Sequence, residues 1–230
     1  DLAGRYTDED ARIRTVEALQ DRFGVDREQA SRVEAVVNRL LVQCREAWDL
    51  EDALLQYLLR WAGRLHEIGL AVAHAQYHKH GAYLLENGDL PGFSRHEQQL
   101  LARLVRAHRR KIPADLFDRL NAPWPARIQR AAVLLRVAVL LNRGRSDSRL
   151  PEFEAVAGKR SLTLRFPDGW LEAHPLTRAD LDEEATLASG NLGDLAARLV
   201  GDAEFLAQFD DPVDDGADAA LGVVDAKVHV

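Results

Sequence analysis

Apolar residues recur at helical spacing through most of the chain. Between residues 30 and 41 they fall at i, i+3 and i+4, the pattern of a helix with one buried face. Asp26 caps that helix, and Ser94 with Glu97 forms a capping box for a later one. The predicted helices cover residues 7–23, 26–45, 50–69, 74–85, 94–108 and 126–143. The first 150 residues are therefore expected to fold as a helical bundle.

The pattern changes after Gly144. Three short segments between turn residues alternate polar and apolar side chains: 153–156, 161–166 and 170–174. This alternation predicts a small antiparallel β-meander, and a last helix is predicted over residues 179–188. We therefore expect a mainly α protein with three parts: a helical domain over 1–150, a small α+β terminal domain over 151–208, and an acidic, flexible tail over 209–230.

Composition narrows the class of protein. The chain has 230 residues, of which 47% are hydrophobic, as in ordinary globular domains. Its apolar runs are too short for a membrane span. A single cysteine, Cys44, excludes an internal disulfide and favours a reducing compartment, so we expect a cytoplasmic protein. The chain has no methionine and starts at Asp1, which suggests a segment of a longer protein.

Charge is unevenly distributed along the sequence. The net charge is −7, yet residues 103–165 hold fifteen Lys and Arg against five Asp and Glu. One basic section in an acidic protein favours a localised anion site over general adhesion to nucleic acid. The alternative is that these basic helices simply face water.

Six of the eight histidines lie between His66 and His108, which invites a metal site. His66, His80 and His108 fall on three successive predicted helices, and a bundle could aim them into one interior. However, the sequence contains neither HExxH nor CxxC and offers no closed ligand set. Histidines satisfied by backbone groups are the simpler interpretation, so no metal is expected.

Basic residues gather at the ends of two predicted helices. Their positions there also favour the helix dipole, which is the structural alternative. Arginine forks nevertheless bind phosphate oxygens in pairs, and a row of them suits a polyanion. The candidate phosphate-binding residues are Arg106, Arg109, Arg110, Lys111, Arg143 and Arg145. No P-loop, GxGxxG or GxSxG pattern is present, and no catalytic residue is assigned.

Several ordered segments resemble one known family. They are Leu-His-Glu-Ile-Gly at 65–69, His-Lys-His-Gly-Ala-Tyr at 78–83, Asn-Gly-Asp-Leu-Pro-Gly-Phe at 87–93, Glu-Gln-Gln at 97–99, Leu-Val-Arg-Ala-His-Arg-Arg at 104–110 and Leu-Leu-Asn-Arg-Gly-Arg at 140–145. Over roughly residues 5–188 the chain resembles the C-terminal region of the exopolyphosphatase/guanosine pentaphosphate phosphohydrolase family. That resemblance implies an HD-like helical bundle followed by a small terminal domain.

The resemblance also implies a function. Full-length family members carry N-terminal actin-like domains that hold the catalytic carboxylate and Mg²⁺ and remove terminal phosphates from inorganic polyphosphate or pppGpp. The region matched here helps shape a basic channel and supports dimerisation. We therefore expect a hydrolase module that binds polyphosphate or pppGpp, works with the missing N-terminal domains and a second copy, and is inactive alone. No cofactor is expected within the chain, whereas Mg²⁺ is implied for the full-length enzyme.

The sequence departs from a working HD phosphohydrolase at its metal ligands. Glu67 stands where the His-Asp pair needs aspartate, and Asn142 stands where a final aspartate is needed. The positions that look like remnants of the metal centre are His66, Glu67, His80, His108 and Asn142. Two alternatives stay open: an autonomous metal-dependent HD-type nucleotide phosphohydrolase, and a purely structural dimerisation domain.

Overall fold

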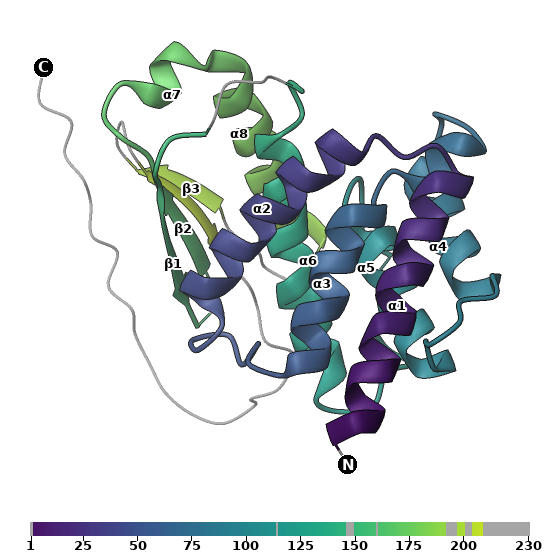
Figure 1. Ribbon diagram of the computed structural model, residues 1–230. Helices are drawn as coiled ribbons and strands as arrows, with labels where there is room; N and C mark the ends of the chain where they lie inside the picture. Colours follow the sequence, from purple (N-terminus) through teal and green to yellow (C-terminus); the bar gives the residue numbers. More distant parts are fainter. Residues whose placement is uncertain are drawn as a thin grey trace, which may run out of the picture.

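The computed structural model describes the backbone of residues 2–113, 115–145, 150–159, 161–191, 197–200 and 204–208, and the side chains of residues 11–113, 115–145, 150–159 and 161–184. A bundle of helices lies beside a small sheet (Figure 1). The bundle contains α1 (Leu2–Arg22), α2 (Arg27–Cys44), α3 (Ala53–Leu65), the 3-10 helix η1 (Ile68–Ala71), α4 (Tyr77–Asn87), α5 (Arg95–Ala107) and α6 (Trp124–Leu141).

Two helices, α2 and α5, begin where local signals in the sequence predict, whereas α1 begins at Leu2 and α4 at Tyr77, away from their predicted starts at residues 7 and 74. The Asp26 carboxylate accepts a hydrogen bond from the Gln29 amide at 2.9 Å, which caps α2. Ser94 and Glu97 form the reciprocal capping box of α5. Each capped helix then buries its apolar face in the common core. The mainly α fold with a small antiparallel appendage is confirmed.

The helix predicted over residues 50–69 is divided. It ends at Leu65, and η1 follows after a two-residue turn. Gly69 lies so close to α4 that a Cβ there would stand 2.0 Å from the Tyr77 carbonyl oxygen. Gly81 packs tightly in return, since its Cβ would lie 3.1 Å from Ile68. These two glycines bring the turn that carries His66 and Glu67 next to the start of α4.

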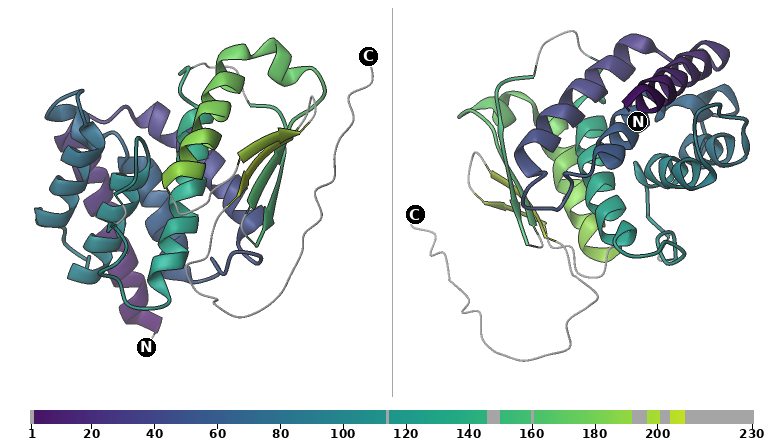
Figure 2. Two further views of the ribbon diagram at one scale, coloured as in Figure 1. Left: turned by 180° about the vertical axis from the view of Figure 1, so that it is seen from behind. Right: turned by 60° about the horizontal axis from the view of Figure 1, so that its bottom comes forward.

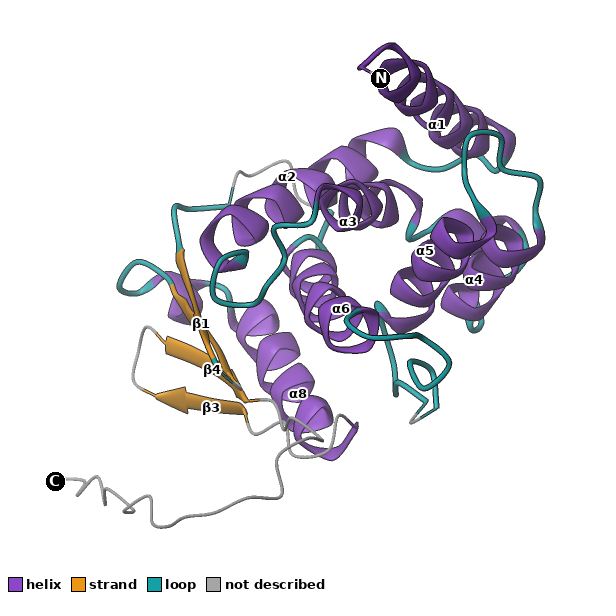
Figure 3. Cartoon of the chain, turned by 90° about the horizontal axis from the view of Figure 1, so that it is seen from below, coloured by secondary structure: helices purple, strands orange, loops and turns teal. Residues whose placement is uncertain are grey.

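Helix α6 lies at the centre of the molecule. It packs against α2, α3, α5 and α8 (Pro175–Asn191), and Figure 3 shows it between them. Because neighbours surround it, α6 is apolar on most sides and has no broad polar stripe. Arg136 is the buried charged exception on this helix.

A four-stranded antiparallel sheet follows the bundle. Its strands are β1 (Glu154–Gly158), β2 (Ser161–Arg165), β3 (Ala197–Val200) and β4 (Glu204–Gln208), in the order β1-β2-β4-β3. Helix α8 contacts β3 and β4 on one side and α6 on the other, which joins the sheet to the bundle (Figure 2).

The third predicted strand, residues 170–174, is wrong. The structure has helix α7 (Trp170–Ala173) there, and β4 takes the place beside β2. Gly169 adopts a left-handed φ of 74° and starts the helical turn. Trp170 and His174 then stack with ring centroids 4.2 Å apart, a contact that i, i+4 spacing in a helix allows. Five residues of alternation are too few to separate the two periods.

One hydrophobic core crosses residue 150. Phe153, Leu162 and Leu171 belong to the same buried cluster as the bundle helices. Arg39 of α2 lies 3.9 Å over the Phe153 ring and donates hydrogen bonds to the backbone of residues 151 and 153. The division at residue 150 stays a prediction, and the predicted tail 209–230 lies outside the described residues. Within the described part, no helix is both long and apolar enough to traverse a bilayer.

Candidate phosphate-binding site

The predicted basic residues at the end of α5 are not needed to complete that helix. Arg136 of α6 donates from Nη1 to the carbonyl oxygens of Ala107 at 2.6 Å and Arg110 at 2.9 Å. Its Nε and Nη2 donate to both carboxylate oxygens of Glu184 on α8. A buried arginine with all these partners therefore satisfies carbonyls at the α5 terminus. The basic run is therefore not needed to satisfy the terminal carbonyl of Ala107.

The chain leaves α5 through a bend that exposes this basic run. Arg110 adopts a left-handed φ of 62°, uncommon for a residue with a side chain. Arg109 packs over the ring of Tyr77 from α4, with its guanidinium carbon 4.5 Å from the centroid. Burial raises the pKa of Tyr77, and the nearby Arg109 opposes that shift. The two arginines are thus presented at the junction of α4 and α5.

Four of the six predicted cations line one cavity of about 340 Å³, namely Arg109, Arg110, Arg143 and Arg145. Gln29 of α2, the His66–Glu67 turn, His108 and acidic residues of α8 line the same space. The structure therefore gathers segments separated by more than a hundred residues around one hollow. Arg106 and Lys111 do not reach it. They line a neighbouring cavity together with Arg109 and Arg110.

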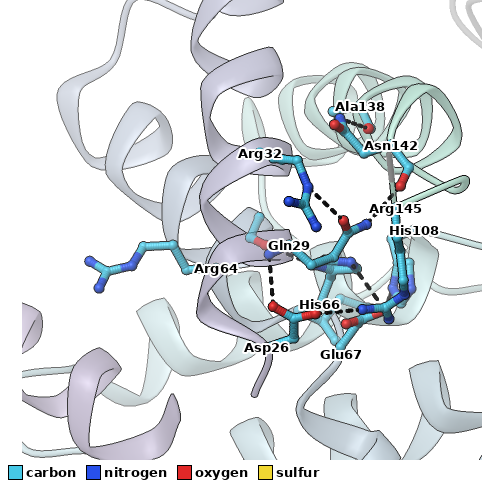
Figure 4. Close-up of polar contacts among 12 residues, drawn as sticks. Asp26, Gln29, Arg32, Arg64, His66, Glu67, His108, Ala138, Asn142 and Arg145 are labelled. Carbon is cyan, nitrogen blue, oxygen red and sulfur yellow. Dashed lines mark hydrogen bonds and ion pairs between the residues drawn. The ribbon is translucent and has the colours of Figure 1, made fainter. Parts of the chain in front are cut away.

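Arg143 and Arg145, just beyond the end of α6, are engaged by carboxylates. Arg143 pairs with Asp180 of α8. Arg145 donates to Asp26 at 2.8 Å and to Glu67 at 2.5 Å, so it bridges the start of α2 and the turn after α3 (Figure 4). The hydrogen bond from the Gln29 backbone amide lowers the pKa of Asp26, and the nearby charge of Arg145 lowers it further. These two arginines act as ties between elements.

Arg106, Arg109, Arg110 and Lys111 differ from that pair. In the described ranges, no carboxylate oxygen lies within 4.0 Å of any of these four side chains. Buried Nη1 of Arg106 has no hydrogen-bond partner at all. Burial also lowers the pKa of that guanidinium. Four cations without counterions at one place form a strong attraction for an external anion.

Of the three histidines predicted to face one interior, the structure brings two together. His66 and His108 are buried with ring centroids 5.5 Å apart. Each Nδ1 faces a backbone carbonyl, Gly63 at 2.7 Å and Val105 at 2.6 Å, so Nδ1 carries the proton. Burial lowers the pKa of both rings, which keeps them neutral. His80 lies on the flank of α4 and lines neither cavity.

Asn142 and Glu67 have structural contacts of their own. Asn142 donates to the Ala138 carbonyl at 2.8 Å, and its own carbonyl accepts from Gln29 at 2.8 Å (Figure 4). Glu67 holds Arg145 and lies 3.9 Å from Nε2 of His66. Across the described side chains, no three His, Cys, Asp or Glu residues are placed to hold a metal ion together.

The order of these segments in the chain matches a known family. The model of Ppx/GppA phosphatase, domain III, covers residues 11–185. The chain belongs to the Ppx/GppA phosphatase family. Both cavities of this Ppx/GppA domain are lined by residues inside the matched segment.

A curated member of the family is similar to this Ppx/GppA chain over 176 residues. It is guanosine-5'-triphosphate,3'-diphosphate pyrophosphatase of Pseudoalteromonas translucida (strain TAC 125), with 38% identity. The alignment covers 76% of this chain and 35% of the relative. The Ppx/GppA chain therefore spans about a third of the length of that relative.

Sequence reasoning missed several residues that shape the site. Asp26 was expected only as a helix cap, yet it also binds Arg145. Asp180 and Glu184 lie on the last predicted helix, and both bind arginines of the α6 segment. Lys79 and buried His78 of α4 line the second cavity. Lys79 could have been noticed in the sequence because it lies among the clustered histidines. The basic residues that line the same cavity, however, come from the later segment 106–111.

Proposed function

We propose that this domain binds the phosphate groups of inorganic polyphosphate or pppGpp for a phosphoanhydride hydrolase and does not itself perform the hydrolysis. The observation that carries the proposal is the group of four cations around the end of α5 with no carboxylate partner among the described residues. Membership of the Ppx/GppA phosphatase family supports the choice of a phosphate ligand. The name of the relative, a guanosine-5'-triphosphate,3'-diphosphate pyrophosphatase, supports the same class of ligand.

The surroundings of the cations favour a phosphate-binding role over the alternative that the basic residues simply face water. Charge-assisted hydrogen bonds from guanidinium groups to phosphate are among the strongest polar contacts in proteins. Arg143 and Arg145 have their charges balanced by carboxylates of the protein itself. The α5 cations are instead held close together, and their mutual repulsion is relieved when an anion binds.

The catalytic step is proposed to lie outside this chain. The Mg²⁺ that the family resemblance implies would be held by residues of the missing N-terminal domains. The described side chains do not fit a metal centre, because Glu67 is already held by Arg145 and the two buried imidazoles supply only two ligands. A homodimer is also part of the proposal, and sedimentation with and without polyphosphate measures it.

Binding of long-chain polyphosphate to the purified chain tests the proposal. We expect binding that weakens steeply with added salt, by analogy with counterion release from nucleic acids. We also expect no phosphate release from polyphosphate or pppGpp by the chain alone. Binding that ignores ionic strength would contradict the proposal. Turnover together with stoichiometric metal would support the rival, an autonomous metal-dependent phosphohydrolase built on the His66–His108 pair.

A further inference from the structure

The guanidinium of Arg145 lies where two carboxylates and two buried imidazoles come together, as Figure 4 shows. It donates to Asp26 at 2.8 Å and to Glu67 at 2.5 Å. The same Glu67 oxygen lies 3.9 Å from Nε2 of His66. The rings of His66 and His108 are in contact, with centroids 5.5 Å apart. Residues of four separate segments thus surround one positive charge.

Both imidazoles present a bare nitrogen. Their Nδ1 atoms face the carbonyl oxygens of Gly63 and Val105, so the proton lies on Nδ1 and the lone pair on Nε2. His108 is 2% exposed, it lines the first cavity, and its Nε2 has no hydrogen-bond partner. An unpaired buried acceptor is costly and is usually satisfied by a ligand or an ordered water. These rings therefore call for a donor or a cation beside them.

The groups around Arg145 are the donor set of a metal site. Two neutral imidazoles and a carboxylate suit a borderline divalent ion such as Zn²⁺ or Co²⁺. Here the carboxylates of Asp26 and Glu67 are engaged by the guanidinium, and no three ligands among the described side chains are placed for a metal ion. Burial lowers the pKa of His66, Glu67 opposes that shift, and the charge of Arg145 adds to it. The arginine charge thus acts on the imidazole directly.

The backbone after α6 is shaped to deliver this guanidinium. Arg145 adopts a left-handed φ of 48°, uncommon for a residue with a side chain. Its amide donates to the Asn142 carbonyl at 3.1 Å, and that carbonyl also accepts from the Gln29 side chain at 2.8 Å. A sparsely populated conformation persists where the surroundings fix it. The turn and the two carboxylates therefore hold Arg145 in one place.

We propose that the carboxylates of Asp26 and Glu67 and the two buried imidazoles form a cation site whose resident cation is the Arg145 guanidinium. Arg145 thereby keeps divalent metal ions out of a pocket that has the ligands for one. The inference stands apart from the proposed function, because none of the cations at the end of α5 takes part in it. It assigns Arg145 the task of occupying this site in place of a metal ion.

Removing the guanidinium tests the site, with Co²⁺ as the probe. Arg145 is 44% exposed, so Arg145→Ala leaves the hydrophobic core intact. We expect this variant to bind Co²⁺ at least about tenfold more tightly than the wild-type chain. The visible absorption of the bound ion and a higher midpoint of thermal unfolding are the readouts. Arg145→Met keeps the aliphatic stem and serves if the alanine variant is unstable.

The matched control is Arg143→Ala. Arg143 lines the same cavity and is paired with Asp180, so its loss removes an equal charge without opening the proposed site. The control is expected to bind Co²⁺ no better than the wild-type chain. Equal Co²⁺ binding by Arg145→Ala and Arg143→Ala would overturn the proposal, since the effect would then reflect net charge.

A second substitution identifies the ligands. Arg145→Ala/Glu67→Gln should lose the gained Co²⁺ affinity by about tenfold or more, because a carboxylate ligand is removed. Glu46 is exposed and lies outside both cavities, so Arg145→Ala/Glu46→Gln should keep that affinity. Affinity that survives Glu67→Gln would place the ion elsewhere and overturn the site.

The wild-type chain gives a test without any substitution. Ring ¹H–¹⁵N spectra are expected to show His66 and His108 as neutral imidazoles protonated at Nδ1. In Arg145→Ala, Zn²⁺ should then shift the Nε2 signals of both rings. A wild-type tautomer protonated at Nε2 would overturn the proposal, because no lone pair would face the cation. Salt-sensitive binding of polyphosphate, the test of the proposed function, succeeds or fails independently of these results.

Discussion

Two groups of arginines with the same expected role lie in opposite surroundings. At the end of α6, Arg143 and Arg145 are held by carboxylates from α8, from the cap of α2 and from the turn after α3. At the end of α5, Arg109 and Arg110 have no such partners among the described side chains. Arginines of the first kind fasten elements together. Those of the second kind keep their charge for a ligand, and the sequence alone does not separate the two kinds.

The largest effect is expected at the residue that holds the α5 terminus in place. Arg136→Met leaves the Glu184 carboxylate without its partner and two carbonyls without a donor. Removing one member of a buried ion pair costs about 3–5 kcal/mol, so the free energy of unfolding in urea should fall by that amount. The control is Arg178→Met, which removes an exposed pair with Glu172 and should cost less than about 1 kcal/mol. Equal losses would contradict the assigned role of Arg136.

The comparison itself is tested by removing two charges from either group. Arg109→Ala/Arg110→Ala should weaken long-chain polyphosphate binding by at least about a hundredfold, since each charge-assisted hydrogen bond contributes about 1.5–3 kcal/mol and two are removed. Arg143→Ala/Arg145→Ala is the matched variant and should lose much less affinity, because its arginines are already paired. Calorimetry at one fixed salt concentration measures both. A larger loss for the second variant would reverse the assignment.

The pH dependence of stability follows from the buried histidines. Burial lowers the pKa of His66 and His108, and burial with the surrounding arginines lowers the pKa of His78 to about 4. The unfolded chain therefore binds more protons below the ordinary histidine value of about 6.5, and stability falls as pH drops from there toward about 4. Each such histidine contributes up to about 1.4 kcal/mol per pH unit.

Urea unfolding between pH 7 and 5 measures this slope. His78→Gln should flatten it, because one proton-binding difference between the folded and unfolded states is removed. His74→Gln changes an exposed histidine and serves as the control. A slope unchanged by His78→Gln would show that this ring is not the group that titrates.

The smallest expected effect is a gain in polyphosphate affinity when a paired arginine loses its carboxylate partner. Asp180→Asn removes the carboxylate that holds Arg143 and should raise polyphosphate affinity about two- to fivefold, the range of an exposed ion pair. Asp168→Asn removes an equal charge from an exposed turn outside both cavities. If both variants gain equally, the effect reflects net charge and not the release of Arg143.

Much of the fold could be predicted because local signals agree with the tertiary structure. The Asp26 cap and the Ser94–Glu97 box start helices where expected. The strand predicted over 170–174 was wrong because a five-residue segment carries too little periodicity. The break after Leu65 was also missed, since it depends on the close approach of Gly69 to Tyr77. A glycine in a sequence does not reveal which backbone it will touch.

The candidate site was predictable in its residue types and less so in its grouping. The basic run at 106–111 was evident, and the structure brings it together. The pairing of Arg145 with Asp26 spans 119 residues, and no local pattern predicts such a contact. His80 was singled out from the spacing of the histidines on the predicted helices, whereas the helical phase of α4 buries His78. The assignment of all six cations as phosphate ligands stays a prediction.

The salt dependence of polyphosphate binding, measured for the wild-type chain and the two double-alanine variants, tests the central claim most directly. By analogy with nucleic acids, each cation that contacts phosphate contributes about 0.7–0.9 to the slope of log affinity against log salt concentration. Arg109→Ala/Arg110→Ala should reduce the magnitude of that slope by about 1.5, and Arg143→Ala/Arg145→Ala should leave it nearly unchanged. A slope that falls only in the second variant would contradict the account.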